Sequence, residues 1–368
     1  MTNGLRWLVI ATHVPPDGSG GGMVRYTTEI IRALHRDPRL ELHVLGIPGG
    51  AALWSSMGLS RERVHVVPGL PTWLLSSAER SGLGLRAMRS HWDVVHGVKH
   101  LVPARTKGLR LLTVHDMLPL DRPADFNWAK RLLLRRPYLA SIEDADCIVT
   151  VSKATLDRLT FHSPGVVDRA RVVQLAASTA LRSVTPVGVP GLEGVRYALV
   201  VGDASPRKNL RTLMLAWHKL VSRGCAVRLV VVGPSGWGTD DNGGQVYQAL
   251  VSTGDLVPLG YVDDAELAWC YRNAELVLCP SRLEGFGLPA VEAMAFGAPI
   301  ITSDDPALCE VTGGMAPHVR ADDVDAWVAA IEQQLGSGRR TAHSVTASIA
   351  HRTWDDVAAE TIDAVLRA

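Results

Sequence analysis

Two carboxylates flank a Gly-rich turn in residues 279–297, which read CPSRLEGFGLPAVEAMAFG. Glu284 precedes the glycines and Glu292 follows them. A carboxylate accepts two hydrogen bonds at once, so carboxylates suit hydroxyl-rich groups such as sugars and ribose. Free backbone N–H groups at the start of a helix attract phosphate. The alternative for the two carboxylates is that they only interact with the helix dipole, which contributes about 0.3–1 kcal/mol. The stretch therefore predicts a turn that holds the phosphate end of a sugar nucleotide.

A basic pair follows a second apolar run. Arg207 and Lys208 lie in GDASPRKN, directly after the expected strand 197–201 and at the start of an expected helix. Cations beside a helix start can clamp a phosphate, and Arg can do so with two parallel hydrogen bonds. A solvated basic pair at the start of a surface helix is the alternative that the spacing leaves open.

Histidines follow expected strand ends in the first half of the chain. His115 ends LRLLTVH and is followed by Asp116, while His96 and His100 lie in DVVHGVKH. Ligands collect at the carboxyl ends of strands in α/β folds, although a lone His is more often a packing or surface residue. The loop at 18–22, GSGGG, suits close approach of a phosphate or sugar, but it is not the GxGxxG dinucleotide pattern and a flexible surface loop is equally consistent with it.

Apolar runs alternate with helix-like periodicity, which predicts parallel sheets covered by helices. In the first half we expect strands at 5–12, 40–46, 64–67, 93–97, 109–115, 146–151 and 171–175, and helices at 23–35, at 127–142 and from 153. In the second half we expect strands at 197–201, 226–233, 257–261, 275–279 and 299–302, and helices at 209–222, 245–253, 264–273, 289–296 and 352–368. Residues 183–194 are rich in Pro and Gly and indicate a linker, so we expect doubly wound domains at 1–183 and 184–351.

Charge is unevenly distributed along the 368 residues, although the net charge is only +1. Residues 1–183 carry 24 Lys and Arg against 15 Asp and Glu, and residues 184–368 carry 14 against 22. Either the first half meets an anionic partner, such as a membrane surface or an acidic acceptor, or two oppositely charged domains face each other across a cleft. A hydrophobic content of 47% provides ample core.

Several classes of protein are disfavoured. The five cysteines are scattered without CxxC spacing, which predicts a reducing compartment and argues against a disulfide framework or zinc site. No GxxxxGK[ST] or HExxH motif occurs, which lowers the expectation of a P-loop hydrolase or a zinc peptidase. No apolar run reaches the length of a transmembrane helix, and the N-terminal run is too short for a secretory signal, so we expect a cytoplasmic protein.

Six stretches together resemble glycosyltransferase family 4, the retaining group 1 glycosyltransferases of GT-B fold. They are PSRLEGFGLPAVEAMAFGAPIITSD (280–304), VGDASPRKNL (201–210), GGMVRYTTEI (21–30), TVHD (113–116), TVSKATLDRL (150–159) and LGYVDDAELAWCYRNAELVLCPS (259–281). The resemblance covers nearly the whole chain. It implies two Rossmann-like doubly wound domains that face a central cleft, an acceptor domain first and a donor domain second, with the helix at 352–368 crossing back to the first domain.

The resemblance also implies roles for named residues. The catalytic set would be His115 near the reaction centre, Glu284 at the transferred sugar, and Arg207 and Lys208 on the donor diphosphate. Glu292 would bind the ribose hydroxyls. The backbone contacts to the donor would come from Gly21, Gly22, Gly202, Gly260, Tyr261, Val262, Phe286, Gly287 and Leu288. Asp203 departs from the pattern, because some members carry an arginine there.

The implied reaction moves a hexose-type sugar from a UDP- or GDP-sugar to an acceptor hydroxyl with retention of anomeric configuration. The leaving phosphate itself would take the acceptor proton, and Arg207, Lys208 and the helix start would replace a metal ion, so no metal and no cofactor is expected. The acceptor would be a glycan, a lipid-linked glycan or a small metabolite, and no nucleic acid partner is expected.

Two other functions share this fold: a sugar-nucleotide 2-epimerase and a non-catalytic sugar-nucleotide-binding protein. The full set of transferase-type motifs disfavours both. The basic helix at 127–142, with Lys130, Arg131, Arg135 and Arg136, could place the protein peripherally at the inner membrane face, or it could be an ordinary solvated face.

Overall fold

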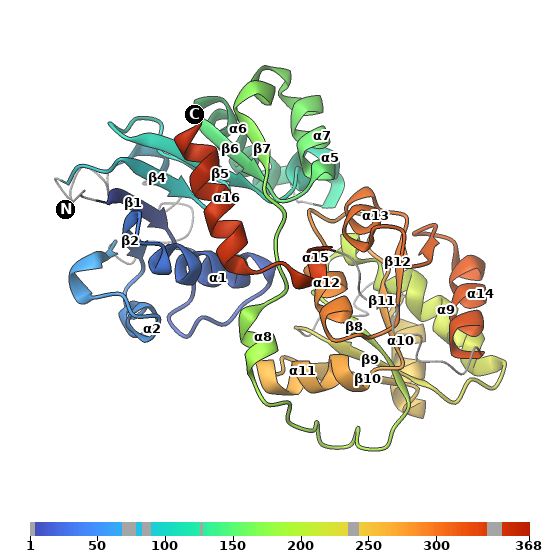
Figure 1. Ribbon diagram of the computed structural model, residues 1–368. Coiled ribbons are helices and arrows are strands. Elements are labelled where there is room, and N and C mark those ends of the chain that lie inside the picture. The colour runs from blue at the N-terminus through green and yellow to red at the C-terminus, as the bar shows by residue number, and fades with distance from the viewer. Residues whose placement is uncertain (1–3, 68–78, 83–89, 126–127, 235–242, 337–347) are drawn as a thin grey trace. The chain divides into compact units, whose positions relative to one another are not determined.

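The computed structural model comprises two compact α/β units and describes residues 4–67, 79–82, 90–125, 128–234, 243–336 and 348–368 (Figure 1). The first unit is Met1–Leu175 with Thr353–Ala368, and the second is Ala176–Arg352. The division lies earlier than the expected linker at 183–194. The short helix α8 (Thr179–Ser183) packs on α11 (Asp264–Asn273), and this contact assigns the residues before the linker to the second unit.

The first unit is built on a parallel sheet of seven strands in the order β3-β2-β1-β4-β5-β6-β7. The strands are β1 (Leu5–Ile10), β2 (Leu40–Gly46), β3 (Val64–Val66), β4 (Val94–Gly97), β5 (Leu109–Val114), β6 (Cys147–Thr150) and β7 (Ala170–Val172). The inner strands are mostly apolar along their buried lengths, as expected for a sheet covered on both faces, with buried polar exceptions that include His96, Thr113 and Thr150. The strand order reverses between β1 and β4, because β2 and β3 are added on one side of β1 and β4 to β7 on the other.

Helices cover this sheet on both sides. They are α1 (Gly22–Arg36), α2 (Ala51–Ser56), α5 (Leu118–Asp121), α6 (Trp128–Asp144), α7 (Lys153–His162) and α16 (Trp354–Leu366), with 3-10 turns η1 (Arg61–Arg63), η2 (Pro123–Asp125) and η3 (Pro164–Arg169). Strand alternation sends Ile148 into a core with α6 and α7. Its neighbour Cys147 meets the backbone of α16 instead.

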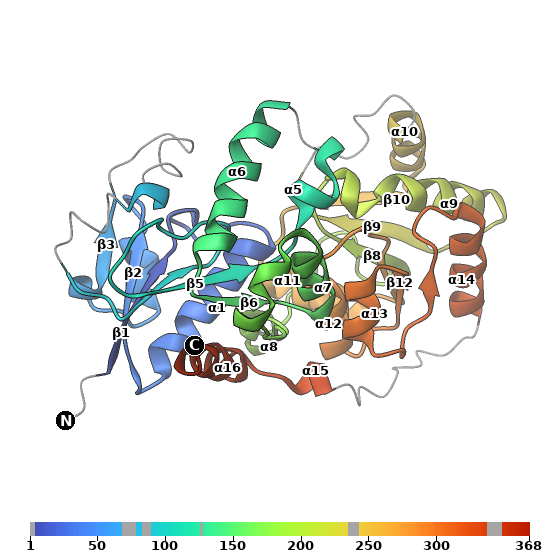
Figure 2. The same cartoon turned by 90° about the horizontal axis from the view of Figure 1, so that it is seen from above.

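The C-terminal helix α16 packs on α1 within the first unit (Figures 1 and 2). Thr353 and Asp356 form a capping box at its start, which satisfies backbone N–H groups that a helix leaves free. The ring of buried Trp354 meets Tyr26 of α1 at 5.7 Å, and Arg36 pairs with Asp355. The last segment of the chain is therefore part of the first unit's own core.

The second unit holds a parallel sheet of six strands in the order β10-β9-β8-β11-β12-β13. The strands are β8 (Tyr197–Val201), β9 (Arg228–Val232), β10 (Leu256–Gly260), β11 (Leu276–Cys279), β12 (Ile300–Ser303) and β13 (His318–Val319). The remaining helices are α9 (Leu210–Ser222), α10 (Gly243–Thr253), α12 (Leu288–Ala295), α13 (Pro306–Thr312), α14 (Val324–Gly336) and α15 (Ser348–His351), with a 3-10 turn η4 (Pro206–Lys208). The main core lies between this sheet and the helices α9, α10 and α14, where Trp217 and Trp327 are fully buried (Figure 2).

Most expected elements lie within a few residues of their predicted bounds. The strand expected at 171–175 is instead Ala170–Val172, and α13 and α14 were not expected. The prediction of a basic face on α6 can be followed only in part, since Lys130 and Arg131 lie outside the side chains that the structure describes, while Arg135 and Arg136 are exposed. Within the described segments, none of the helices combines the length and the hydropathy needed to span a membrane.

Candidate functional site

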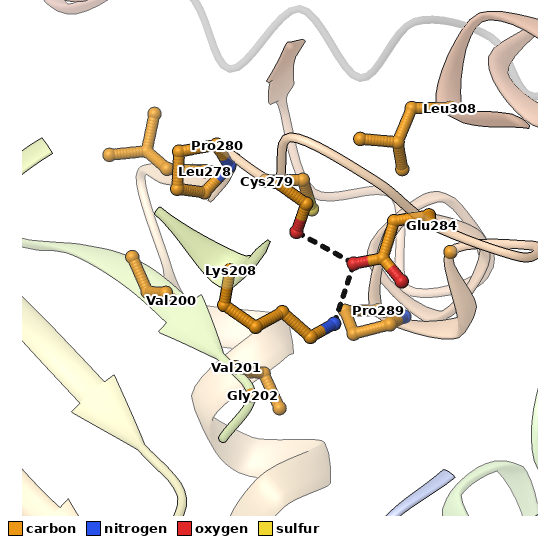
Figure 3. Close-up of a pocket in the computed structure, with 12 residues that line it drawn as sticks. Val200, Val201, Gly202, Lys208, Leu278, Cys279, Pro280, Glu284, Pro289 and Leu308 are labelled. Carbon is orange, nitrogen blue, oxygen red and sulfur yellow. Dashed lines mark hydrogen bonds and ion pairs between the residues drawn. The ribbon is translucent and has the colours of Figure 1, made fainter. Parts of the chain in front are cut away.

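The two expected phosphate-binding segments meet where the second sheet changes direction. The chain lays β9 and β10 on one side of β8 and then crosses to place β11 on the other side. The carboxyl ends of β8 and β11 are therefore neighbours, and open α/β sheets bind ligands at such switch points. A pocket of about 310 Å³, counting space open to solvent, lies there (Figure 3). It is lined by Val200, Val201, Gly202, Lys208, Leu278, Cys279, Pro280, Ser281, Glu284, Gly287, Pro289 and Leu308.

Glu284 is the centre of charge in this pocket. Its carboxylate accepts hydrogen bonds from Lys208 Nζ at 2.6 Å, Arg207 Nη1 at 3.1 Å and Ser281 Oγ at 2.6 Å, and Figure 3 shows Lys208 reaching toward it. Burial alone would raise the pKa of Glu284, but the charges of Lys208 and Arg207 outweigh burial and hold the pKa at about 2. The structure thus brings together three of the four residues expected to be catalytic, as an ionised carboxylate between two cations.

A strained residue, Asn209, positions the basic pair. Its φ of 55° makes it the one non-glycine residue with positive φ in the described part of the chain, and Asn tolerates this left-handed conformation better than most residues. The buried Asn209 amide donates to the carbonyl of Pro280 at 3.1 Å, and Arg282 N donates to the Arg207 carbonyl at 2.7 Å. These bonds join the loop after β8 to the turn after β11. Sequence reasoning missed Asn209, although an Asn directly before a helix that follows Arg-Lys was a usable signal.

Gly287 lets the turn enter α12. Its φ is 93°, and a Cβ atom there would lie 2.5 Å from Leu308 Cδ2. Leu288 begins the helix, and Pro289 lies in the first turn, where its missing N–H has no helical partner to lose. The Phe286 side chain is buried in the core, which leaves the backbone of this turn for the contacts expected of it.

Glu292 is not among the residues that line the pocket around Glu284. It lies further along α12, is 4% exposed, and its Oε2 accepts a hydrogen bond from the Tyr271 hydroxyl at 2.9 Å. We expected both carboxylates to address one ligand. Of the two, the residues that line the described pocket include only Glu284.

Sequence reasoning also missed Asp305, a buried carboxylate behind the turn. Asp305 is the N-cap residue directly before α13, and its carboxylate accepts hydrogen bonds from Ala307 N at 3.0 Å, Leu308 N at 3.1 Å and Glu284 N at 3.2 Å. Burial and the nearby charge of Glu284 raise the pKa of Asp305 to about 6, against the effect of these N–H groups. An Asp directly before Pro is a known helix-start signal and could have revealed it.

Three glycines lie side by side at the carboxyl ends of β8, β9 and β10. Gly202 N donates to Val232 O at 3.0 Å, and Gly233 N donates to Gly260 O at 2.9 Å. A Cβ on Gly233 would lie 1.7 Å from the Gly202 carbonyl oxygen, so this position requires glycine. Gly260 has open space around it and a φ of 70°, Tyr261 is 67% exposed, and Val262 is half-buried. Sequence reasoning singled out Gly202 and Gly260 but not Gly233.

The remaining expected site residues, His115, Gly21 and Gly22, belong to the first unit. His115 Nε2 lies 2.8 Å from the Val98 carbonyl oxygen, and the Tyr26 ring meets the imidazole edge-on at 4.6 Å. Burial lowers the pKa of His115, which favours the neutral imidazole. Gly21 and Gly22 are exposed at the start of α1.

The two further histidines weighed for this region differ in burial. His96 is fully buried, and its Nε2 lies 2.8 Å from Thr113 Oγ1, so it belongs to the core. His100 is half-buried, with the Tyr138 ring edge-on at 5.4 Å.

Two family descriptions match this chain, one mainly over the first structural unit and the other over the second. The family description "Glycosyltransferase Family 4" matches residues 20–177, and "Glycosyl transferases group 1" matches residues 189–347. O-antigen chain mannosyltransferase B of Escherichia coli is 31% identical over 292 residues, which cover 76% of this chain and 75% of that protein. The MMP alpha-(1->4)-mannosyltransferase of Mycolicibacterium hassiacum is 30% identical over 334 residues, 80% of this chain and 76% of the relative.

A solved structure shows the same fold. Anabaena HepE in complex with UDP and glucose superimposes with a TM-score of 0.73 at 16% identity, covering 99% of this chain and 100% of that one. The expected fold class, two Rossmann-like units of GT-B type, is confirmed.

Proposed function

The chain belongs to the group 1 glycosyltransferases of family 4, and on that premise we propose that it moves a hexose from a UDP- or GDP-sugar to an acceptor hydroxyl with retention of configuration. Glycosyltransferase activity follows from the family. The donor nucleotide, the sugar, the stereochemistry and the independence from metal are parts of the proposal.

The observation that carries the proposal is the convergence of Arg207 and Lys208 on one carboxylate in the pocket. Arg207 lies 3.1 Å and Lys208 2.6 Å from the Glu284 carboxylate. The same two cations can bind the oxygen atoms of a diphosphate that enters the pocket. A diphosphate leaving group gains negative charge as the sugar bond breaks, and preorganised cations stabilise that charge. We infer that these side chains do the work that a metal ion does in other transferases.

The relatives favour mannose as the transferred sugar. Both proteins described above are named mannosyltransferases, whereas HepE was solved with UDP and glucose. GDP-mannose, UDP-mannose and UDP-glucose therefore head the panel of donors to test.

The test incubates the full chain with each radiolabelled donor, with and without EDTA, and separates free sugar, transferred sugar and intact donor. We expect turnover of one donor, unchanged by EDTA. Lys208→Ala should lose turnover, while Lys219→Ala, which removes an exposed lysine paired with Asp325 at 2.7 Å, should keep it. An α-linked product from an α-linked donor, identified by NMR, would support retention, and a β-linked product would refute it.

The same panel separates the two other functions of this fold. Interconversion of sugars at C2 without release of the nucleotide would identify an epimerase. Binding of a nucleotide sugar with neither hydrolysis nor transfer would identify a non-catalytic binding protein. A cytoplasmic location and peripheral contact with an inner membrane face stay predictions.

A further inference from the structure

Five ionisable side chains gather at the carboxyl edge of the first sheet. His13 follows β1, Lys99 and His100 follow β4, and His115 follows β5. These three strands are neighbours in the sheet, at its change of direction, so the residues that follow them lie at one edge. Glu79 joins them through its contact with Thr12, whose hydroxyl donates to the Glu79 carboxylate. We refer to His13, Glu79, Lys99, His100 and His115 as the edge cluster.

The members of the edge cluster interact electrostatically with one another. Burial lowers the pKa of His13 to about 3, with smaller contributions from the charges of Lys99 and His115. Burial likewise lowers the pKa of His100 to about 3, with contributions from Lys99, His115 and His13. All three imidazoles therefore favour the neutral form, in which one nitrogen donates and the other accepts.

Lys99 and Glu79 offset each other within the cluster. Burial lowers the pKa of Lys99 and raises that of Glu79, and the attraction between them opposes both shifts. The positive charge of Lys99 and the negative charge of Glu79 cancel, and the imidazoles are neutral, so the edge cluster carries no net charge. The side chains are half-buried, so they are sheltered but still reachable from solvent.

The cluster offers hydrogen bonds rather than charge. The second unit's pocket directs two cations at one point, whereas Glu79 would repel an anion that approached Lys99. Nor do the imidazoles converge as metal ligands: no group of three or more His, Cys, Asp or Glu suited to an ion occurs among the described residues. A mixture of imidazoles, a carboxylate and an ammonium group suits hydroxyl groups, which both donate and accept.

We propose that the edge cluster is the acceptor subsite and that it binds an uncharged, hydroxyl-rich saccharide end rather than a phosphorylated or otherwise anionic acceptor. This inference rests on the proposed function, because it names the substrate class of the same reaction. His13, Glu79, Lys99 and His100 would bind hydroxyls of the acceptor sugar beside His115.

Binding of two sugar probes to the full chain tests the proposal. Methyl α-D-mannopyranoside is the neutral probe and mannose 6-phosphate the anionic one, each followed by saturation-transfer difference NMR in the presence of the donor's nucleoside diphosphate. We expect the neutral probe to bind at least tenfold more tightly than the phosphorylated one, with no competition from inorganic phosphate. Tighter binding of mannose 6-phosphate, or no binding of the neutral probe, would overturn the proposal.

Variants locate the binding. Glu79→Gln and His13→Ala should each weaken neutral-probe binding about tenfold. His91→Ala should not, because His91 is an exposed histidine of the same unit paired with Asp93 at 3.3 Å. Unchanged affinity in both cluster variants, with circular dichroism showing an intact fold, would refute the assignment.

Donor hydrolysis separates this proposal from the function on which it rests. Transfer of the sugar to water needs only the donor pocket, so wild-type donor hydrolysis tests the proposed function. Transfer to a saccharide tests the acceptor assignment: Glu79→Gln and His13→Ala should lose it, and the control His91→Ala should keep both activities. If the wild type neither hydrolyses a donor nor transfers its sugar, the proposed function fails. If hydrolysis persists but the cluster variants transfer normally, only the acceptor assignment fails.

Discussion

Replacing Glu284 by Gln removes the negative charge from the second unit's pocket and keeps the shape of the side chain. In the wild type this carboxylate is 9% exposed and bonded to both Lys208 and Arg207. Its pKa falls from 4.5 to about 2, and at about 1.36 kcal/mol per pKa unit the ionised form stabilises the folded state by about 3 kcal/mol. At roughly 2–4 °C per kcal/mol, the variant should unfold about 6–12 °C lower at pH 7.

The pH dependence of that difference has a definite sign. Because the folded-state pKa of Glu284 is depressed, its stabilisation is present above pH 4.5 and is lost as the pH falls through about 2. The gap in Tm between wild type and Glu284→Gln should therefore narrow steadily over that interval.

The same substitution should strengthen anion binding. Glu284 is paired with both cations in the structure, so an entering diphosphate must compete with it for them. Glu284→Gln removes this competitor, and the same 3 kcal/mol sets a ceiling of about a hundredfold on the gain in affinity. We expect pyrophosphate to bind about tenfold to a hundredfold more tightly to the variant, while sugar transfer falls.

Isothermal titration with pyrophosphate at pH 7 and thermal unfolding between pH 2 and 8 measure both effects. Glu275→Gln is the matched control, since Glu275 pairs with Arg196 at 2.6 Å at the amino ends of the same two strands, where Arg196 is 59% exposed. Such a pair contributes at most about 1 kcal/mol, so the control should change little. Pyrophosphate affinity that is unchanged or weaker in Glu284→Gln would refute the idea that Glu284 acts as a competing counter-ion.

Two further predictions concern the residues that hold the turn. The pKa of Asp305 is raised from 3.8 to about 6, so its stabilisation is full below pH 3.8 and is lost as the pH rises through about 6. Lowering the pH from 7 to 5 should therefore raise the Tm of the wild type through Asp305, and Asp305→Asn should lack this rise. Equal pH profiles of Tm in the two proteins would contradict the raised pKa of Asp305. Gly287→Ala should lose about 3 kcal/mol in urea unfolding, because φ is 93° and the new Cβ would lie 2.5 Å from Leu308 Cδ2. Gly297→Ala, with a φ of 66° and open space, should lose only about 1 kcal/mol, and equal losses would show that the contact with Leu308 costs nothing.

The pocket of the second unit was largely predictable because its residues lie close to strand ends in the sequence. The apolar runs that end at Val201 and Cys279 are unambiguous, and parallel strands place their carboxyl ends at one edge. Arg207, Lys208 and Glu284 follow those runs within a few residues. No pattern in the sequence says that β8 and β11 are neighbours, however, since β9 and β10 come between them along the chain.

The side-chain partners within the site could not be predicted. Glu284 and Glu292 look alike in sequence, on either side of one turn. In the structure, Glu284 meets two cations and Glu292 meets the Tyr271 hydroxyl, because the helix rotates the second carboxylate toward α11. A spacing of residues specifies which face a side chain occupies but not what packs against that face.

The edge cluster of the first unit shows the same limit. His96 was expected within the strand 93–97, His100 after it and His115 at the end of the strand 109–115, but the sequence pattern did not predict that His96 is fully buried and the other two half-buried. His13 reaches the cluster from the turn after β1 and Glu79 from a short helical segment at 79–81, and no periodicity in the sequence predicts that the two meet. Their association depends on strand order across 103 positions of chain, from His13 to His115.

If the proposed function is right, Glu284 changes partners when a donor binds, and this predicts an order of events. A diphosphate that binds Lys208 and Arg207 removes two of the three side chains described above as donating to the Glu284 carboxylate and leaves Ser281. The freed oxygen atoms can then accept hydrogen bonds from a sugar hydroxyl, which a carboxylate between two cations does poorly. A free sugar cannot displace those cations, because it carries no charge to replace that of Glu284. We infer that the pocket recognises the sugar only after the diphosphate of the same molecule has entered, so that one residue serves first as counter-ion and then as sugar ligand.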